Sequence, residues 1–381
     1  MAIRLLFISK KKHLLYWSKI VILILSVASV FVACSGDIQV EKGVKNSTDT
    51  PSQQETITPT LSTLCEVHEG GSIKSALNDT GCTTITVYSG DYREEGWYKL
   101  ERSGVTLQAE GKAIIDIIIV YGNNNTVRGF TITNPEQKTC IRTYGDNNLI
   151  ENNECYNTAE DGMWLWGRNN IIRGNYIHNI YDDRNWPSFD NHVDCFMTWA
   201  WSQSYYNSVD NLLIEGNTCI LDRPHGSNQF FILTHDNNSV PITNITFRNN
   251  VFIANDTGYV PIAFFGDSSV TGVQVVNNTF YNTTGQGDEA VWAENMPDVF
   301  IANNAIIGYN SVVRVVESNV TDENNVIDPP YGMLNYQSFD FHLLAGSPLI
   351  DAGVPLDLGY DFDGNLRDEK PDIGAFEYHN P

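Results

Sequence analysis

A short motif that returns along the chain constrains its fold more than any other feature. The motif reads apolar, charged, Gly or Asn, Asn, any residue, apolar, and its copies are spaced 22 to 42 residues apart. They cover Val127–Ile132 (an imperfect first copy), Ile150–Cys155, Ile172–Ile177, Ile214–Cys219, Phe247–Phe252, Val275–Phe280 and Ile301–Ile306. A repeat of this size, with short β-prone runs between Asn and Gly, is typical of a solenoid.

The apolar runs predict strands, because each holds only three to six residues of Val, Ile, Phe and Thr. One coil per repeat places these strands in parallel, roughly 4.8 Å apart. The first apolar positions then form one core stack and the last positions form another. The first stack is Val127, Ile150, Ile172, Ile214, Phe247, Val275 and Ile301, and the second is Ile132, Cys155, Ile177, Cys219, Phe252, Phe280 and Ile306.

Polar residues of the motif predict two further ladders. The second Asn of each copy aligns at a turn, where Asn tolerates left-handed backbone geometry and stacked amides hydrogen-bond between coils; these residues are Asn153, Asn175, Asn217, Asn250, Asn278 and Asn304. The charged position alternates in sign through Arg128, Glu151, Arg173, Glu215 and Arg248. We interpret this stripe as an exposed ion-pair ladder, which requires the 42-residue step to be a single enlarged coil.

Both ends of the repeat region resemble those of a known family. Residues 71–77 followed by 84–92 are similar to a capping helix and first strand, and residues 345–353 and 371–378 resemble the C-terminal segment of secreted bacterial β-helix proteins. The chain therefore resembles the right-handed parallel β-helix, or pectin-lyase-like, proteins. The resemblance implies an all-β fold, with the β-helix over 64–328 and a C-terminal cap segment over 329–381. It implies little about the reaction, since this scaffold carries lyases, hydrolases, esterases, epimerases and noncatalytic adhesins.

The N-terminal residues predict export. Lysines precede an apolar run over residues 20–33, which is the order found in a secretory signal. Small residues directly before Cys34 resemble a lipoprotein processing site, so we expect lipid on Cys34, with an uncleaved membrane anchor as the alternative. Residues 34–63 have the composition of a flexible tether. Both alternatives place the rest of the chain outside the cytoplasmic membrane, at the cell surface, in the periplasm or in the medium.

The remaining six cysteines also favour an oxidising compartment. Cys65 and Cys82 bracket the start of the domain and are candidates for a disulfide. Cys140 and Cys155 share one coil, as Cys195 and Cys219 share another, at equivalent repeat positions. Disulfides would explain this coincidence, and buried thiols explain it nearly as well.

The net charge of the chain argues against some classes of binding partner. The chain carries 46 acidic and 23 basic residues, a formal net charge of −23. An acidic surface repels phosphate backbones, which argues against DNA or RNA. An anionic glycan would need a local cationic patch or a bridging cation.

Aromatic residues mark a candidate binding surface on the second strand of successive coils. Period two sends one row outward, Arg142, Trp164, Met197 and Ile232, followed by another, Tyr144, Trp166, Trp199 and Thr234. An exposed row of Tyr and Trp matches the CH-rich faces of sugar rings. The alternative is that inserted loops cover these rings as a satellite core.

Polar candidates gather in the same coils. Asp161, Asp194 and Gln229 are expected to align at the starts of three consecutive strands, where paired carboxylates raise each other's proton affinity or share a Ca²⁺ ion. The alternative is that they cap strand ends through backbone N–H groups. Residues 191–195 resemble a His-x-Asp element of some secreted β-helix proteins. The candidate bases are Arg142, His192, His225 and His235, and their spacing does not choose among them.

These observations lead to one hypothesis and two rivals. The hypothesis is an exported, lipid-anchored β-helix enzyme that cleaves a polysaccharide, as a lyase or a glycoside hydrolase, in a groove over residues 140–236. A Ca²⁺ cofactor held by Asp161 and Asp194 is compatible with this hypothesis, which requires no particular metal. A noncatalytic glycan-binding or adhesion solenoid would keep the tryptophans and dispense with the acids, and a purely structural surface protein would bury the tryptophans.

Overall fold

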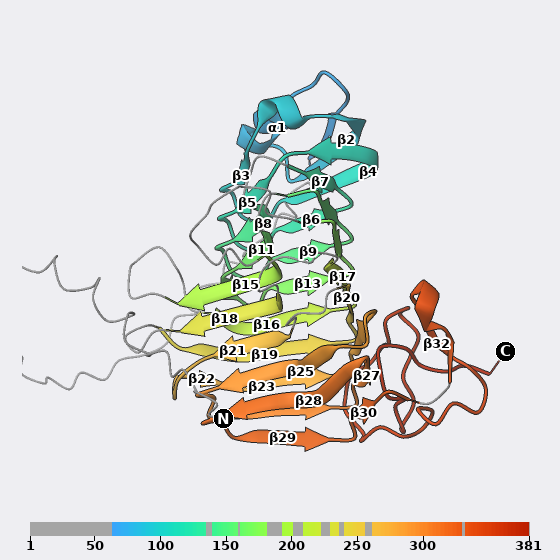
Figure 1. The fold of residues 1–381 in the computed structure, drawn as a ribbon. Coiled ribbons are helices and arrows are strands. Elements are labelled where there is room, and N and C mark those ends of the chain that lie inside the picture. The colour runs from blue at the N-terminus through green and yellow to red at the C-terminus, as the bar shows by residue number, and fades with distance from the viewer. Residues whose placement is uncertain are drawn as a thin grey trace, which may run out of the picture. The chain divides into compact units, whose positions relative to one another are not determined.

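Short strands wind into a stack of coils in the computed structural model of the chain (Figure 1). The structure describes residues 63–134, 139–158, 161–180, 193–200, 209–221, 229–235, 240–255, 261–329 and 332–380. Among the strands of this described part, every pairing is parallel except one, between β31 (Met333–Asn335) and β32 (Asp340–Leu343). The described helices are all too short or too polar to span a membrane. The fold is a right-handed parallel β-helix, as the repeat predicts.

One side of the stack is a nine-stranded sheet that runs through consecutive coils. Its strands are β3 (Tyr98–Leu100), β5 (Ile118–Val120), β8 (Thr139–Thr143), β11 (Asp161–Leu165), β15 (Asp194–Ala200), β18 (Gln229–His235), β21 (Ile262–Phe265), β25 (Gly287–Glu294) and β28 (Tyr309–Val316). They pair in this order, one strand per coil. The outer face of this sheet holds the candidate site.

Two further parallel ladders complete the coils. Both start at β4 (Thr106–Ile115), which itself follows β1 (Leu64–Val67) and β2 (Thr84–Asp91). The first continues through β6 (Thr126–Arg128), β9 (Leu149–Glu151), β13 (Ile171–Arg173), β16 (Val209–Glu215), β19 (Ile242–Arg248), β23 (Val273–Val276), β26 (Val299–Ala302) and β29 (Val320–Glu323), with β12 (Gly167–Arg168) and β22 (Val270–Thr271) beside it. The second continues through β7 (Thr131–Thr133), β10 (Glu154–Tyr156), β14 (Tyr176–His178), β17 (Thr218–Leu221), β20 (Val251–Ala254), β24 (Thr279–Asn282), β27 (Ala305–Ile307) and β30 (Val326–Ile327).

Both predicted core stacks are confirmed. Val127, Ile150 and Ile172 pair in register, and the series continues to Ile301. The second series runs in register from Ile132 to Ile306. All of these side chains are fully buried, so identical repeat positions form the apolar centre of the solenoid. The pairing of Ile172 with Ile214 confirms that the 42-residue step is one enlarged coil.

The Asn ladder is also confirmed, with one correction to its geometry. Asn153 Nδ2 donates to Asn175 Oδ1 at 3.1 Å, and equivalent bonds run coil by coil to Asn325, one step beyond the predicted ladder. The left-handed residue is the one before each ladder Asn, such as Asn152 (φ 54°) or Gly174 (φ 63°). The preceding residue therefore makes the turn, which leaves the buried amide free to bond between coils.

The charged stripe forms ion pairs, but it is less exposed than predicted. Arg128 Nη1 lies 3.5 Å from Glu151 Oε1, while Arg173 Nη2 and Arg248 Nε lie 2.5 and 2.7 Å from the two oxygens of Glu215. Glu215 is buried. Residues 360–364 of the C-terminal segment line one pocket together with these three side chains, so distant residues cover this part of the stripe.

The N-terminal end carries a short helix and an additional strand. Helix α1 (Ile73–Asn78) begins after Ser72, whose hydroxyl accepts a hydrogen bond from the Ser75 N–H, and it buries Ile73 and Leu77. It lies at the N-terminal end of the stack (Figure 1). The first strand is β1 (Leu64–Val67), not the predicted segment at 84–92, which forms the next strand, β2.

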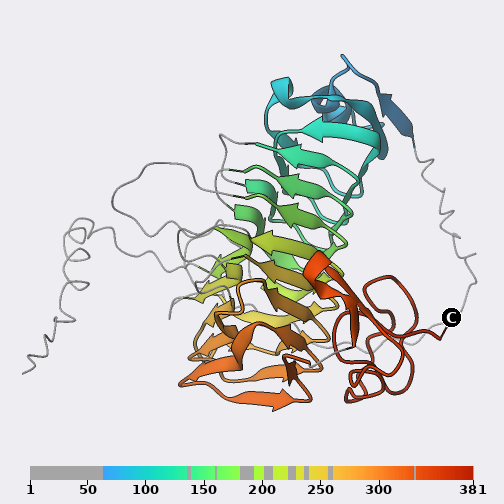
Figure 2. The same ribbon diagram turned by 45° about the vertical axis from the view of Figure 1, so that its right-hand side comes forward.

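The C-terminal segment lies beside the last coils (Figure 2). Its apolar residues, such as Phe341, Leu349 and Ile373, pack against side chains of β20, β24 and β27. Buried amides of the coils anchor it, since Asn277 Nδ2 donates to the Asp372 carbonyl at 2.7 Å. Residues 361–365 form a turn in which the backbone N–H groups of Asp363 and Asn365 donate to Asp361 Oδ1. The segment therefore packs on the side of the solenoid formed by β20, β24 and β27, whereas the nine-stranded sheet forms a different side.

Candidate functional site

Three rows of side chains lie on the outer face of the nine-stranded sheet. The first row, at the strand starts, contains Thr139, Asp161, Asp194, Gln229 and Glu289. The central row contains Lys99, Ile119, Arg142, Trp164, Met197, Ile232, Ala263, Trp292 and Arg314. The third row contains Tyr121, Tyr144, Trp166, Trp199, Thr234 and Phe265. The residues between them, such as Ile141 and Phe196, face the core.

The predicted aromatic row exists as a ladder of stacked rings. Tyr121 stacks on Tyr144 with ring centroids 5.0 Å apart, and Tyr144 stacks on Trp166 at 4.9 Å. Trp199 meets Trp166 edge-on at 4.4 Å. Tyr121, which lies one coil earlier and directly follows β5, is a further member that was not predicted from the sequence. Register alone brings these rings together, since they come from four different coils.

The rings of this ladder differ in burial: some are partly exposed, and one lies beneath them. Tyr144, Trp164 and Trp199 are partly exposed, but Trp166 is only 1% exposed, and its Nε1 donates to the Trp199 carbonyl at 2.8 Å. Trp166 therefore offers little surface to a substrate. Trp166 packs beneath its neighbours, where it supports the rings that reach the surface.

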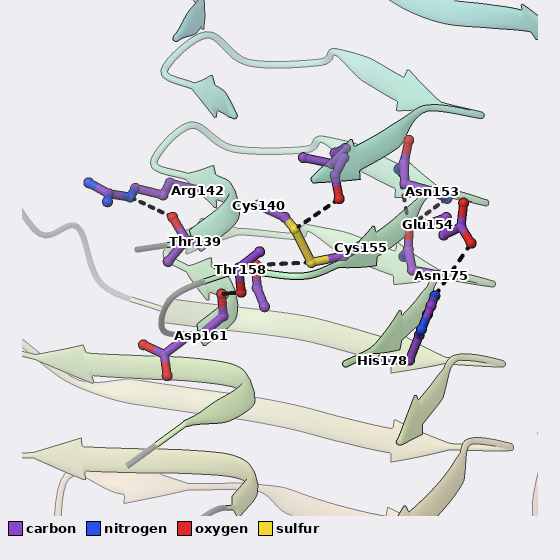
Figure 3. Close-up of a disulfide and its surroundings, with 12 residues drawn as sticks. Thr139, Cys140, Arg142, Asn153, Glu154, Cys155, Thr158, Asp161, Asn175 and His178 are labelled. Carbon is purple, nitrogen blue, oxygen red and sulfur yellow. Dashed lines mark hydrogen bonds and ion pairs between the residues drawn. A yellow bond between two sulfur atoms is a disulfide. The ribbon is translucent and has the colours of Figure 1, made fainter. Parts of the chain in front are cut away.

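Arg142 belongs to the same surface through cation–π contacts. Its guanidinium carbon lies 4.0 Å from the Trp164 ring centroid and 5.6 Å from that of Trp97, a residue that the sequence argument did not single out. Its Nε donates to Thr139 Oγ1 at 2.9 Å. Figure 3 shows Arg142, Thr139 and Asp161 on one side of their strands, away from the Cys140–Cys155 disulfide. Arg142 is therefore fixed in place by aromatic and polar contacts.

Asp161 and Asp194 align as predicted, but their carboxylates cap strands. The Asp194 backbone N–H donates to Asp161 Oδ1 at 2.9 Å, and the Gln229 N–H donates to Asp194 Oδ1 at the same distance. Trp164 Nε1 donates to Asp161 Oδ2 at 2.7 Å. Asp161 is 2% exposed and Asp194 is 0% exposed. The strand-capping alternative is therefore the one that the geometry matches, because each acid satisfies the first N–H of the next coil.

The hydrogen bonds of this row fit strand capping better than they fit the binding of a cation. Ca²⁺ takes six to eight oxygen ligands, and both oxygens of Asp161 already accept hydrogen bonds. In the described part of the row, the buried oxygens without a hydrogen-bond partner are Gln229 Oε1 and Glu289 Oε1, too few to form a calcium site. Among the described residues, the one His, Cys, Asp or Glu group with metal-site spacing is Cys65, Asp79 and Cys82, whose cysteines form a disulfide.

The structure does not bring His235 to the acids. His235 ends β18, whereas Gln229 begins it, so six residues or roughly 20 Å separate the two ends. The His235 side chain is 1% exposed, with Nδ1 2.9 Å from Asp267 Oδ2 and Nε2 3.0 Å from the Val240 carbonyl. Burial raises the pKa of Asp267, but hydrogen bonds from Ser269 and the His235 ring outweigh this and lower it. His192 and His225, the two other predicted histidine bases, lie outside the described residues.

The sequence argument missed a second group of the same composition. Glu289 precedes Trp292 by three residues, as Asp161 precedes Trp164, and Arg314 lies 4.2 Å from the Trp292 ring centroid. An acidic residue three positions before Trp on a strand of the same sheet was the available signal. We call Asp161, Trp164 and Arg142 the first acid–Trp–Arg group, and Glu289, Trp292 and Arg314 the second.

Disulfides hold the coils beneath the first group. Cys140 bonds to Cys155 and Cys195 bonds to Cys219, two coils apart, while Cys65 bonds to Cys82 near the N-terminal end. The coincidence of repeat positions is therefore explained by disulfides rather than by free thiols. Cys34 lies outside the described residues.

Comparisons with known proteins agree with this architecture. The family model described as right handed beta helix region matches residues 116–306. Among solved structures, pectate lyase Pel9A is 16% identical with a TM-score of 0.53 over 84% of this chain and 98% of that one. The Streptococcus pneumoniae surface protein and adhesin PfbA is 11% identical (TM-score 0.43; 67% of this chain, 91% of that one). The catalytic domain of a GH87 alpha-1,3-glucanase, in complex with tetrasaccharides, is 15% identical (TM-score 0.30; 73% and 71%).

No curated relative matches the sequence. The family model spans half of the chain, and the strands that it covers form the parallel ladders and the first aromatic surface described above. The chain belongs to the right-handed β-helix family.

Proposed function

We propose that the protein is an exported carbohydrate-active protein that binds a polysaccharide over Tyr144, Trp164 and Trp199. The observation that carries this proposal is the ladder of partly exposed rings on one face, with Arg142 fixed beside it. Flat apolar rings match the CH faces of sugars, and a fixed guanidinium offers donors to sugar oxygens. Aromatic and Arg side chains also dominate the energy of many binding surfaces.

Export is part of the proposal and has its own support. All six cysteines of the described residues are paired in disulfides. Disulfides persist in oxidising compartments and are rare in the cytosol of most organisms. The signal-like residues ahead of Cys34 fit the same destination, with lipid on Cys34 as the anchor to the membrane.

Cleavage of the polysaccharide, by a lyase or a glycoside hydrolase, is the second candidate function. The observation that favours it is the stack of Asp161 and Asp194 beside Trp164, on the fold shared with a pectate lyase. The burial of both carboxylates favours binding without cleavage, because a general acid or base must reach the substrate. We therefore rank binding first and cleavage second.

One experiment separates these functions. The full chain is incubated with acidic and neutral polysaccharides, while affinity, absorbance of unsaturated uronides and release of reducing ends are measured. Trp164→Ala and Trp199→Ala should each weaken binding by about tenfold or more. The matched control is Tyr176→Ala, which removes an exposed aromatic ring from a different ladder.

Each outcome has a defined meaning. Binding that is lost in the tryptophan variants and kept in Tyr176→Ala supports the proposal. If the wild type turns over a polysaccharide and Asp194→Asn or His192→Ala abolishes that turnover, cleavage becomes the first-ranked function. Affinity that is equal in the tryptophan variants and the control would refute a binding site on this face.

A further inference from the structure

The second acid–Trp–Arg group places the same kinds of residue at another point on the same face, with its Arg on the strand after the Trp, where the first group has it on the strand before. Trp292 lies in the central row, four strands beyond Trp164, which corresponds to roughly 19 Å at the usual strand spacing. Arg314 pairs in register with Trp292 and stacks over its ring at 4.2 Å. Phe265 meets the same indole edge-on, with ring centroids 4.8 Å apart.

Arg314 is more available than its counterpart in the first group. Its side chain is 51% exposed, and Glu289 Oε1 lies 4.0 Å from Arg314 Nη1, beyond hydrogen-bond distance. The guanidinium lies over the Trp292 ring, and half of the Arg314 side chain is exposed, so its N–H donors are accessible to a ligand. The planar fork of guanidinium donors matches the two oxygens of a carboxylate or a sulfate.

Glu289 repels an anion at this site less strongly than an exposed Glu would. The carboxyl is buried, and its Oε1 has no hydrogen-bond partner. Burial raises the pKa of Glu289, which Asp288 also favours, and Arg314 offsets only part of this increase. The acid beside Arg314 is thus held closer to its neutral form than an exposed Glu would be.

A pocket of about 670 Å³ adjoins these rings at Phe265. Its other lining residues include His235, Asp267, Asn295 and Glu317. This volume lies within the usual range for small-ligand sites, and the polar lining suits hydroxyl groups. Asp267 and Glu317 would repel an anion inside the pocket, so the anionic group of a ligand belongs at Arg314 instead.

From this geometry we infer that Arg314, Trp292 and Phe265 form a second glycan subsite, which binds an acidic sugar residue of a polysaccharide. The guanidinium takes the carboxylate or sulfate, the exposed parts of the two rings contact the apolar face of the sugar, and the pocket receives hydroxyl groups of a neighbouring residue. The inference rests on the proposed function, since it extends binding along the same sheet. Ile232 and Ala263 are buried between the two groups, so the second subsite is separate from the first.

The test measures binding of matched polymer pairs to the full chain. Polygalacturonate is compared with its methyl ester, and dextran sulfate with dextran, because the members of each pair differ chiefly in charge. We expect the charged member to bind more tightly and to lose affinity as salt increases. Arg314→Gln should weaken its binding by about tenfold or more, because a charge-assisted contact is lost. Trp292→Phe, which keeps a ring, should weaken it less than Trp292→Ala.

The control is Arg93→Gln, which removes an exposed Arg that pairs with Asp91 outside the nine-stranded sheet. A cooperative unfolding transition with its midpoint well above the temperature of the binding assay establishes that each variant is folded. Equal affinity for the charged and neutral members would overturn the inference. So would wild-type affinity in Arg314→Gln and Trp292→Ala while Trp164→Ala loses binding, an outcome that leaves the proposed function standing. Loss of binding in Trp292→Ala and Arg314→Gln alone supports the second subsite and refutes the first.

Discussion

The two acid–Trp–Arg groups differ in what their acids do, although both place an Arg over a Trp on one sheet. In the first group, Asp161 accepts hydrogen bonds from Trp164 Nε1 and from the N–H of the next coil. In the second, Glu289 Oε1 has no hydrogen-bond partner and its pKa is raised by burial. The first group is therefore built into the architecture, whereas the second keeps an unsatisfied carboxyl and a half-exposed Arg314.

Covalent bonds add to this difference. The first group lies beside two coils that are each cross-linked internally, one by the Cys140–Cys155 disulfide and the other by Cys195–Cys219. The last cysteine in the chain is Cys219, so the coils of the second group depend on packing and hydrogen bonds alone. The same kinds of residue can thus be hydrogen-bonded into the backbone at one site and only partly satisfied at the other.

The largest expected effect concerns the tryptophan beneath the first group. Trp166→Ala should lower stability by about 3–5 kcal/mol, because it empties a buried site and removes ring contacts to Tyr144 and Trp199. Trp292→Ala should lower it by about 1–2 kcal/mol, since that ring is partly exposed. Urea unfolding monitored by circular dichroism measures both. Similar losses in the two variants would remove the distinction between a supporting and a surface ring.

A smaller effect is expected when each acid is truncated. Asp161→Ala leaves the Asp194 N–H and the Trp164 Nε1 without their acceptor, at a cost of about 1–3 kcal/mol. Glu289→Ala removes an oxygen that accepts no hydrogen bond, so we expect a smaller loss. Hydrogen exchange of the Asp194 amide gives a local measurement, and it should accelerate only in the Asp161 variant. Unchanged exchange there would show that the capping bond is dispensable.

The smallest effect depends on pH and is specific to the second group. Because burial raises the pKa of Glu289, the folded state favours the protonated carboxyl. The contribution of this carboxyl to the free energy of unfolding is fully present below the ordinary Glu pKa, and it declines as pH rises through the raised pKa. The Gln side chain of Glu289→Gln cannot lose a proton. The unfolding midpoint of this variant should therefore rise relative to that of the wild type as pH increases. Thermal unfolding from pH 4 to pH 8 checks this, with Glu369→Gln, an exposed site, as the control. A constant difference across this range would contradict the raised pKa.

Much of the fold could be predicted from the sequence, because it repeats one local pattern. The motif specifies strand, turn and amide ladder together, and a shift of one residue would turn the core positions outward. The residues from Val127 to Ile301 therefore align in the structure as the sequence predicts. The alternating charges predicted the enlarged coil for the same reason. Two of the three disulfides, Cys140–Cys155 and Cys195–Cys219, were predicted from equivalent repeat positions only as one of two alternatives.

The candidate site depends on tertiary contacts that a repeat does not encode. Period two places Trp166 on the outer face, but neighbouring rings from other coils decide that it is buried and Trp199 is not. Asp161 and Asp194 align in sequence, yet only the register of their backbone N–H groups makes them strand caps. The sequence by itself determined which residues are neighbours across the coils, because hydrophobic burial sets the register. The tertiary structure decided which of them are satisfied and which remain open to a ligand, because that depends on hydrogen-bond geometry between distant segments.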